Sequence, residues 1–384
     1  MNNTTPAKPA SPSPGKHVIV AGCGNIGSFL VLLLVRMAEI AKLTLVDFDV
    51  YEENNFSSQH IAPADFGKSK AGVLARLARR LNPRLEVIPI VARLESVPPG
   101  NLRGDVMLAC LDSKEARRSA NELAWHLGMP LVDAGIEASA SLVRVNVYQP
   151  TAGQPCLECA WDQRDYAQLT VTHPCDAANP AAPATGAPAC LGALAASLQA
   201  IECRKILGGD VSAAGRQVLI DAASHQHFVT TFRRNSHCRF NHAIWDLSRP
   251  QAVAASMTVS EALKLAGPGQ ATLTFAGMQL ARQLACPGCG FTRRVLRLES
   301  RFRPREKTCP RCGRALLVTG FHSLPKLNAG ELDRGISARS LASLGLREGD
   351  IMSVSDGTSE KIIELGPAHV TRSARHHSVN RRIS

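Results

Sequence analysis

The sequence predicts an α/β fold: a doubly wound, mostly parallel sheet of the Rossmann kind with an antiparallel extension. Three observations predict it. Short apolar runs rich in β-branched residues alternate with helix-length segments over residues 17–133. A glycine motif formed by Gly22, Gly24 and Gly27 follows the first of these runs and opens the first helix. Beyond residue 142, strand-like runs recur without a helix after each one.

Each expected element has its own justification. The first apolar run, 17–21, is uninterrupted, as expected of a strand buried on both faces. The helix expected over 25–40 is apolar nearly all round, which suits a position beneath a sheet. The remaining expected strands cover 43–46, 86–91, 106–111 and 130–133, and the next expected helices cover 70–80 and 114–127. Strands over 142–148 and 217–232 predict the antiparallel extension, with a helix over 191–207 between them.

Composition excludes several classes of protein. Hydrophobic residues make up 45% of the 384 residues, enough for a sizeable core, but no uninterrupted apolar run is long enough to span a bilayer. Residues 1–16 lack the apolar segment of a secretory signal and are expected to be disordered, so the expected location is cytoplasmic. The formal net charge of +12 favours an acidic partner surface or nucleic acid, unless it only solubilises the surface.

Polar residues follow the expected strands at the edge where a doubly wound sheet binds its ligands. Asp47 fits the single acid that holds a ribose hydroxyl in an ordinary dinucleotide site. Four further residues exceed the needs of such a site, namely Asp49, Asn55, Lys70 and Asp112. Magnesium prefers carboxylate oxygens, and a lysine offsets charge on a moving phosphate. The set therefore indicates a nucleoside triphosphate with Mg²⁺, whereas a plain strand–helix turn is the alternative interpretation of the glycine motif.

Several sequence blocks, in one order, resemble the ThiF/MoeB/ubiquitin-activating family of adenylating enzymes. The blocks are GCGNIGS, LTLVDFD, NNFSSQ, GKSKA, ACLDSKEARRSAN, PLVDAG, GQPCLEC, SLQAIECRKIL and FRRNSHC. The resemblance covers roughly residues 17–242. It implies a homodimeric adenylyltransferase that uses ATP and Mg²⁺ to activate the C-terminal glycine of a small ubiquitin-like carrier protein, with release of pyrophosphate.

The resemblance also implies roles for individual residues. The implied phosphate-binding residues are Gly22, Gly24, Gly27, Asn55, Gln59 and Lys70. The implied ribose ligand is Asp47. Asp49 and Asp112 would serve Mg²⁺ and the region of the attacking carboxylate. Lys70 and Asp112, together with a reactive cysteine, form the expected catalytic set.

The sequence departs from the family pattern at a few positions. Ser58 stands where the family usually has an arginine that meets the triphosphate, and a guanidinium is hard to replace. Asn25 and Ser113 stand where the family usually has a glycine and an asparagine. Arg76 and Arg117 are candidates to supply the missing cation. Otherwise the protein is a slow enzyme or a non-catalytic nucleotide-binding scaffold.

Thioester-forming relatives carry a reactive cysteine on a crossover loop ahead of the helix that bears the SLQA block. Cys175 is the preferred nucleophile, because it lies in the Ala- and Pro-rich loop expected over 173–188 and beside His173. A mobile, accessible thiol can reach the adenylate. Cys190, at the start of the following helix, is the alternative nucleophile. A third alternative is that no thioester forms and the adenylate is released.

One set of metal ligands is expected within the same region. Cys156 and Cys159 form a C-x-x-C pair, and the family has a second pair where this chain has Cys238 followed by His242. Thiolate and imidazole both suit tetrahedral zinc, so these four residues predict a Cys₃His structural site. His237 is the alternative fourth ligand, and four unligated residues are a further alternative.

A second set of cysteines lies near the C-terminus. Two C-x-x-C pairs, each followed by glycine, are formed by Cys286, Cys289, Cys309 and Cys312. This spacing predicts a zinc ribbon held together by a second structural Zn²⁺. Basic residues crowd 293–314 but few aromatic residues accompany them, which disfavours nucleic acid. Docking of an acidic carrier or conjugating protein is the preferred role.

These features divide the chain into five predicted segments: a disordered tail (1–16), an adenylation domain (17–247), a zinc-ribbon domain (248–325), a small β-rich module (326–369) and a basic tail (370–384). The expected function is adenylation of a ubiquitin-like protein, thioester formation on Cys175 and transfer to a conjugating enzyme. The C-terminal segments resemble elaborations found in bacterial ubiquitin-like conjugation operons, some linked to antiphage defence. Sulfur-carrier activation for thiamine or molybdopterin synthesis, a binding scaffold and a NAD-dependent dehydrogenase are the alternatives.

Overall fold

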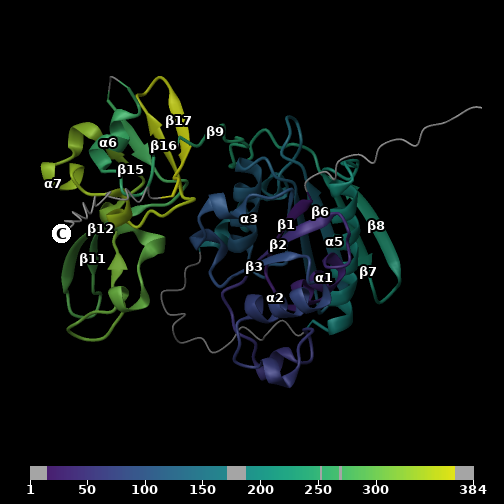
Figure 1. Ribbon diagram of the computed structural model, residues 1–384. Coiled ribbons are helices and arrows are strands. Elements are labelled where there is room, and N and C mark those ends of the chain that lie inside the picture. The colour runs from purple at the N-terminus through teal and green to yellow at the C-terminus, as the bar shows by residue number, and fades with distance from the viewer. Residues whose placement is uncertain (1–14, 171–186, 251–252, 268–269, 368–384) are drawn as a thin grey trace, which may run out of the picture. The chain divides into compact units, whose positions relative to one another are not determined.

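The structure is a computed structural model that describes residues 15–170, 187–250, 253–267 and 270–367. The chain forms two compact units, Met1–Trp245 and Asp246–Ser384 (Figure 1). An eight-stranded sheet, in the order β3-β2-β1-β4-β5-β6-β7-β8, forms the centre of the first unit.

The first unit contains all the elements of the predicted sheet. Its strands are β1 (Lys16–Ala21), β2 (Ile40–Val46), β3 (Glu86–Ile90), β4 (Val106–Ala109), β5 (Leu131–Glu137), β6 (Leu142–Tyr148), β7 (Arg216–Asp221) and β8 (Gln226–Thr231). Its helices are α1 (Asn25–Leu34), α2 (Lys70–Leu81), α3 (Lys114–His126), α4 (Gln163–Thr170) and α5 (Ala189–Leu207). Strands β1 to β5 pair in parallel, and β6 to β8 are antiparallel, so the prediction of a mostly parallel sheet with an antiparallel extension is confirmed.

Alternation along β1 shows why helices cover both faces of the sheet. Val18 and Val20 pack into a core formed with α1, α2 and α5. Ile19 and Ala21, whose side chains point the opposite way, pack into a second core with α3. All four side chains are essentially inaccessible to solvent, which explains why the sequence of this strand is uninterrupted by polar residues.

Predicted boundaries differ from the structure at some elements: the strand expected over 130–133 continues to Glu137, and the first helix is shorter than expected. The helix expected over 25–40 ends at Leu34, and Ile40 already belongs to β2, where it pairs with Lys16. The intervening residues form a turn in which the Met37 backbone N–H donates to the Leu34 carbonyl and the Ile40 N–H donates to the Met37 carbonyl. Apolar content alone did not reveal this turn, because the helix and the strand after it are both buried.

The second unit contains two small sheets. Its elements are β9 (Leu247–Ser248), α6 (Val259–Lys264), β10 (Thr272–Thr274), β11 (Leu280–Ala285), β12 (Thr292–Leu298), β13 (Leu317–Val318), β14 (Ser323–Leu324), β15 (Lys326–Asn328), α7 (Arg334–Ser337), β16 (Ile351–Ser355) and β17 (Glu360–Glu364). One sheet has the order β15-β10-β16-β17-β9, and the other has β11 between β12 and β13, with β14 also paired to β11. Strand β10 thus pairs with both β15 and β16, across the boundary expected between residues 325 and 326. The five segment boundaries stay predictions.

No helix among the described residues is both long and apolar enough to cross a membrane.

Candidate functional site

The glycine turn after β1 is shaped by close backbone contacts. Gly22 has a φ of +96°, and a Cβ there would lie 2.4 Å from the Cys110 carbonyl oxygen. A Cβ on Gly27 would lie 2.1 Å from the Gly22 carbonyl oxygen. Gly24 is different, because the nearest atom to its Cβ position would be Gln59 Nε2 at 4.0 Å. Two glycines are therefore needed for packing, and the third leaves its backbone open to close approach by a ligand.

Asp47, directly after β2, braces this turn. Its Oδ2 accepts a hydrogen bond from the Cys23 backbone N–H at 2.7 Å, and its Oδ1 accepts one from the Asp49 N–H at 2.8 Å. Burial raises the pKa of the Asp47 carboxyl above its ordinary value, against the lowering effect of these two donors. Each carboxylate oxygen retains a lone pair, so the same side chain can also accept from a ribose hydroxyl.

Lys70, the first residue of α2, lies against the same region. Its ammonium is 3.3 Å from Asp49 Oδ2 and 5.9 Å from the centre of the Tyr51 ring. The Tyr51 hydroxyl donates to the Cys23 carbonyl at 3.0 Å, so the glycine turn, the segment after β2 and α2 are tied together. Lys70 is only 8% exposed, and a cation held at this depth is well placed to attract phosphate.

The segment after Tyr51 supplies the predicted amides. Asn55 is buried; its Oδ1 accepts from the Glu52 N–H at 3.0 Å, and its Nδ2 donates to Asn54 Oδ1 at 3.0 Å. Gln59 Oε1 is buried with no hydrogen-bond partner among the described residues. Ser58 is also buried, and its hydroxyl donates to the Asn55 carbonyl at 3.4 Å. Gln59 Nε2, the donor end of the same amide, is the atom nearest to the Cβ position of Gly24 at 4.0 Å, and an amide N–H at this place can donate to a phosphate oxygen.

Asp112 lies just beyond β4 and is exposed. Among the residues that the structure describes, none makes a hydrogen bond or ion pair with its carboxylate. The adjacent Ser113 caps α3 by accepting from the Ala116 N–H at 3.2 Å. Asp112 is therefore open to solvent at the same sheet edge as the glycine turn, while its neighbour has a structural role.

The cysteines differ in access. Cys175 lies outside the described residues. Cys190, in the first turn of α5, is exposed. Cys23 and Cys203 are fully buried, and burial raises the pKa of both thiols, as it does for Cys110. Low thiolate content makes these three cysteines poor nucleophiles.

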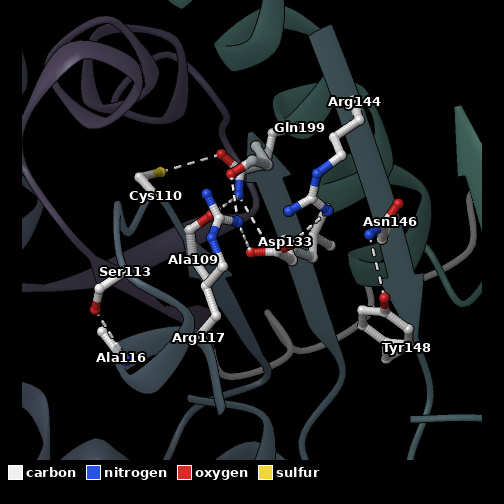
Figure 2. A network of polar contacts seen from close by, with 12 residues as sticks. Ala109, Cys110, Ser113, Ala116, Arg117, Asp133, Arg144, Asn146, Tyr148 and Gln199 are labelled. Carbon is white, nitrogen blue, oxygen red and sulfur yellow. Dashed lines mark hydrogen bonds and ion pairs between the residues drawn. The ribbon is translucent and has the colours of Figure 1, made fainter. Parts of the chain in front are cut away.

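A buried polar network beside the glycine turn was missing from the sequence predictions (Figure 2). Asp133 on β5 has no solvent exposure and pairs with two arginines, Arg117 of α3 and, at 3.0 Å, Arg144 of β6. Gln199 of α5 donates to the Ala109 carbonyl at 3.1 Å and to the Val132 carbonyl at 2.8 Å, bridging β4 and β5. An acid within a buried apolar strand was the available signal, since such a carboxylate needs a cationic partner.

The two arginines proposed to replace the one missing at Ser58 have partners. Arg117 Nη1 donates to Asp133 and, at 2.9 Å, to the Ala134 carbonyl. Arg76 Nη2 lies 3.9 Å from Asp65 Oδ1, and its side chain is 57% exposed. Arg117 is therefore held firmly on the β5 side of the site, and Arg76 has the looser contact.

The first predicted metal site is assembled. Cys156, Cys159, Cys238 and His242 place one ligand atom each within 4.8 Å of one another. The Cys156 sulfur lies 3.9 Å from that of Cys159 and 3.8 Å from that of Cys238, and His242 Nε2 lies 3.3 Å from the Cys159 sulfur. Tetrahedral zinc with Zn–S bonds of about 2.3 Å needs sulfurs about 3.8 Å apart. His242 Nδ1 bonds the Phe240 carbonyl at 2.7 Å, which leaves Nε2 for a metal.

The second cluster has the same character. Cys286, Cys289, Cys309 and Cys312 again place their sulfurs within 4.8 Å of one another, with Cys286 to Cys312 at 3.4 Å and Cys289 to Cys309 at 3.6 Å. Four thiolates that converge in this way fit zinc, the usual occupant of such a set.

Comparisons with known proteins find similar sequences for the first unit. The family model described as "ThiF family" matches residues 15–240, which lie within the first unit. The pig protein "Adenylyltransferase and sulfurtransferase MOCS3" is 32% identical over 209 residues, covering 53% of this chain and 43% of that protein. The Escherichia coli K12 "Sulfur carrier protein ThiS adenylyltransferase" is 27% identical over 225 residues, covering 58% and 84%. The Haloferax volcanii "SAMP-activating enzyme E1" is 27% identical over 229 residues, covering 58% and 78%. The chain thus spans less than half the length of the first of these relatives.

Proposed function

The chain belongs to the ThiF family, and on that premise we propose that it is an adenylyltransferase that activates the C-terminal glycine of a ubiquitin-like protein with ATP. The observation that carries the proposal is the convergence of the glycine turn, Asp47, the Lys70–Asp49 pair and the Gln59 amide at one edge of the sheet. The relatives named as adenylyltransferases and activating enzymes support it.

In the proposed reaction, a carboxylate oxygen of the tail attacks the α-phosphorus of ATP. The bond between that phosphorus and the bridging oxygen breaks, pyrophosphate leaves, and an acyl-adenylate forms. Backbone N–H groups of the glycine turn and the Lys70 ammonium would hold the phosphates, and Asp47 would hold the ribose. Asp49 and Asp112 offer the carboxylate oxygens that Mg²⁺ prefers, and the ion would offset phosphate charge.

The acyl group would then pass to a cysteine. A thiolate attacks the acyl carbon, AMP leaves, and a thioester remains for transfer to a conjugating enzyme. Cys175 is the proposed nucleophile from its place in the sequence, and exposed Cys190 is the alternative. The two cysteine clusters would each hold a structural Zn²⁺. The basic residues of the second unit, within 293–314, would bind an acidic partner protein. A cytoplasmic homodimer acting in antiphage conjugation is the setting that this function suggests.

Sulfur-carrier activation is the second candidate, because two of the relatives have names that include sulfur-carrier or sulfurtransferase activity. The adenylation step is the same in both candidates. A third candidate, a binding scaffold, draws on Ser58, which leaves the triphosphate without the usual arginine.

The test combines purified protein, ATP, Mg²⁺ and a ubiquitin-like protein that ends in Gly-Gly. ATP–pyrophosphate exchange that requires the carrier supports adenylation, and a thiol-sensitive adduct on a non-reducing gel supports the thioester. Loss of that adduct in Cys175→Ala but not in Cys190→Ala identifies the nucleophile. Exchange without any adduct favours sulfur-carrier activation, and intact ATP binding without exchange favours the scaffold.

A further inference from the structure

The pair Arg117 and Arg144 carries more positive charge than its buried partner balances. Asp133 contributes one negative charge, and both of its oxygens are occupied, Oδ1 by Arg117 and Oδ2 by Arg144. Among the described residues no second carboxylate pairs with either guanidinium. The group of three therefore has a net charge of +1, in a place where Arg117 is 12% exposed and Arg144 is 34% exposed. A half-sheltered, uncompensated guanidinium attracts an anion.

The strand register brings the two guanidinium groups to one point. Gly135 lies opposite Arg144 in the β5–β6 pairing, and Asp133 lies two residues before Gly135 on the same face. A Cβ on Gly135 would be 3.1 Å from Arg144 Nε, 3.2 Å from Arg144 Nη2 and 3.3 Å from Arg117 Nη2. Three guanidinium nitrogens thus gather over the backbone of Gly135, where a side chain would displace them. Figure 2 shows the two side chains approaching Asp133 from opposite sides.

The position of this cluster in the sheet suggests which anion it meets. In the strand order, Asp47 and Lys70 follow β2, the glycine turn follows β1, Cys110 and Asp112 follow β4, and Gly135 and Arg144 lie on β5 and β6. A nucleotide whose ribose lies near Asp47 and whose phosphates lie over the glycine turn ends near β4. The next group along the edge belongs to the second substrate. In the proposed reaction that substrate enters as a carboxylate, which the phosphates repel and a cation must stabilise.

We propose that Arg117 and Arg144 form the binding site for the substrate's C-terminal carboxylate, next to the nucleotide and distinct from the phosphate-binding turn. This inference rests on the proposed adenylation for the identity of the ligand. Arg117, fixed by Asp133 and the Ala134 carbonyl, orients the pair. Arg144, the more exposed of the two, presents its Nε and Nη2 to the carboxylate, in the forked geometry that suits it.

The test uses full-length protein with ATP and a synthetic peptide ending in Gly-Gly, either as the free acid or as the C-terminal amide. Arginine Nε–H resonances report on contact, and the signal of Arg144 is assigned by its absence in Arg144→Gln. The free acid should bind at least about tenfold more tightly than the amide and should shift this signal. In Arg144→Gln the preference should fall below about threefold, while ATP affinity stays unchanged. Arg144→Lys, which keeps the charge but not the fork, should be intermediate.

Two controls keep the result interpretable. Arg204→Gln removes an exposed guanidinium of α5, 71% exposed, and should leave the preference unchanged. Arg144→Gln leaves Asp133 paired with Arg117, so thermal unfolding should confirm an intact fold. Equal affinity of acid and amide for the wild-type protein overturns the proposal. If pyrophosphate and not the peptide shifts the Arg144 Nε–H resonance, and ATP binds more weakly to Arg144→Gln, the two arginines bind phosphate. That result also overturns the proposal. Pyrophosphate exchange, measured separately, tests adenylation whatever the peptide result.

Discussion

Lys70 and Asp49 form an ion pair, 3.3 Å between Nζ and Oδ2, in which the lysine side chain is 11% exposed and the aspartate side chain is 44% exposed. The ion pair thus fixes the position of the buried lysine ammonium, and the aspartate is the partner on the solvent-exposed side. A polyphosphate entering from that side meets an ammonium that is already oriented, at little cost in side-chain entropy.

Replacing this ammonium should therefore impair catalysis more than folding. Lys70→Ala should lower the rate of carrier-dependent ATP–pyrophosphate exchange about 10²-fold or more, because charge on the transferring phosphates loses its counter-ion. Lys70→Arg should retain part of the rate. Lys42→Ala, which removes the 3.1 Å pair with Glu86 on β2 and β3, is the matched control and should leave the rate within about twofold. An unchanged rate in Lys70→Ala would contradict the assignment of this site.

Because Asp47 is a buried carboxyl in the proposed ribose-binding position, we expect nucleotide affinity to depend on pH. Burial raises the pKa of this carboxyl above 3.8, so on acidification it takes up a proton at a higher pH than an ordinary aspartate. Only the carboxylate form accepts fully from both backbone N–H groups and from the ribose. The ratio of the ATP dissociation constants of Asp47→Asn and wild type should be about tenfold at pH 8 and should approach one as the pH falls through the raised pKa.

Taking the ratio of the two constants removes the ionisation of ATP, which affects both proteins equally. Asp221→Asn, at the last residue of β7, where the side chain accepts from the backbone of the following turn, is the control and should give a ratio near one at every pH. A ratio for Asp47→Asn that stays constant with pH would show that the carboxylate does not take part in binding.

The sequence predicted the edge of the sheet at which the site lies. Asp47 and Asp112 each follow an apolar strand, and parallel strands in a doubly wound sheet end at one edge, so topology alone assigns both residues to that edge. The contacts of Arg117 did not follow. It lies 16 residues before Asp133, on a helix whose rotation over the sheet is set by packing. Periodicity assigns a residue to a helix face but does not identify the strand residue that it reaches.

The fourth ligand of the first cysteine cluster illustrates the same limit. His242 has a φ of +56°, an uncommon backbone conformation for a residue other than glycine. This conformation brings its Nε2 to the Cys159 sulfur, and Trp125 packs edge-on against its ring at 4.8 Å. Spacing alone left His237 as an alternative, because the left-handed turn could not be foreseen. His242, and not His237, belongs to the assembled cluster.

Zinc content should follow these assignments. The wild-type protein should contain two zinc ions per chain, measured by inductively coupled plasma mass spectrometry after gel filtration. His242→Ala and Cys289→Ser should each reduce this to one, because each removes a ligand from a different cluster. His237→Ala is the matched control and should keep two. Loss of zinc in His237→Ala, with two ions retained in His242→Ala, would exchange the roles of the two histidines.

The second unit contains a buried ion pair whose disruption should be costly. Arg301 is 3% exposed and Asp350 is fully buried, and Arg301 Nη2 donates to Asp350 Oδ1 at 2.6 Å. Asp350 Oδ2 also accepts from the Arg347 backbone N–H at 2.7 Å, so the carboxylate links the segment after β12 to the turn before β16. Removing one partner of such a pair leaves a charge in a medium of low polarity, where solvation cannot replace the lost contact.

Arg301→Met should therefore lower the free energy of unfolding of this unit by about 3–5 kcal/mol. The three tryptophans, Trp125, Trp161 and Trp245, all lie in the first unit, so intrinsic fluorescence does not report on the second. Hydrogen exchange measured by mass spectrometry on peptides from 253–367 reports on the second unit, and the protection factors of these peptides should fall in Arg301→Met.

Arg249→Ala removes an exposed arginine, 55% accessible, from its 2.8 Å pair with Glu364, and should cost at most about 1 kcal/mol. In the double variant Arg301→Met with Asp350→Asn, no unpaired charge remains and the Arg347 N–H keeps an acceptor, so much of the lost protection should return. Equal losses in the single and double variants would mean that packing of the arginine stem, and not the buried charge, stabilises this unit.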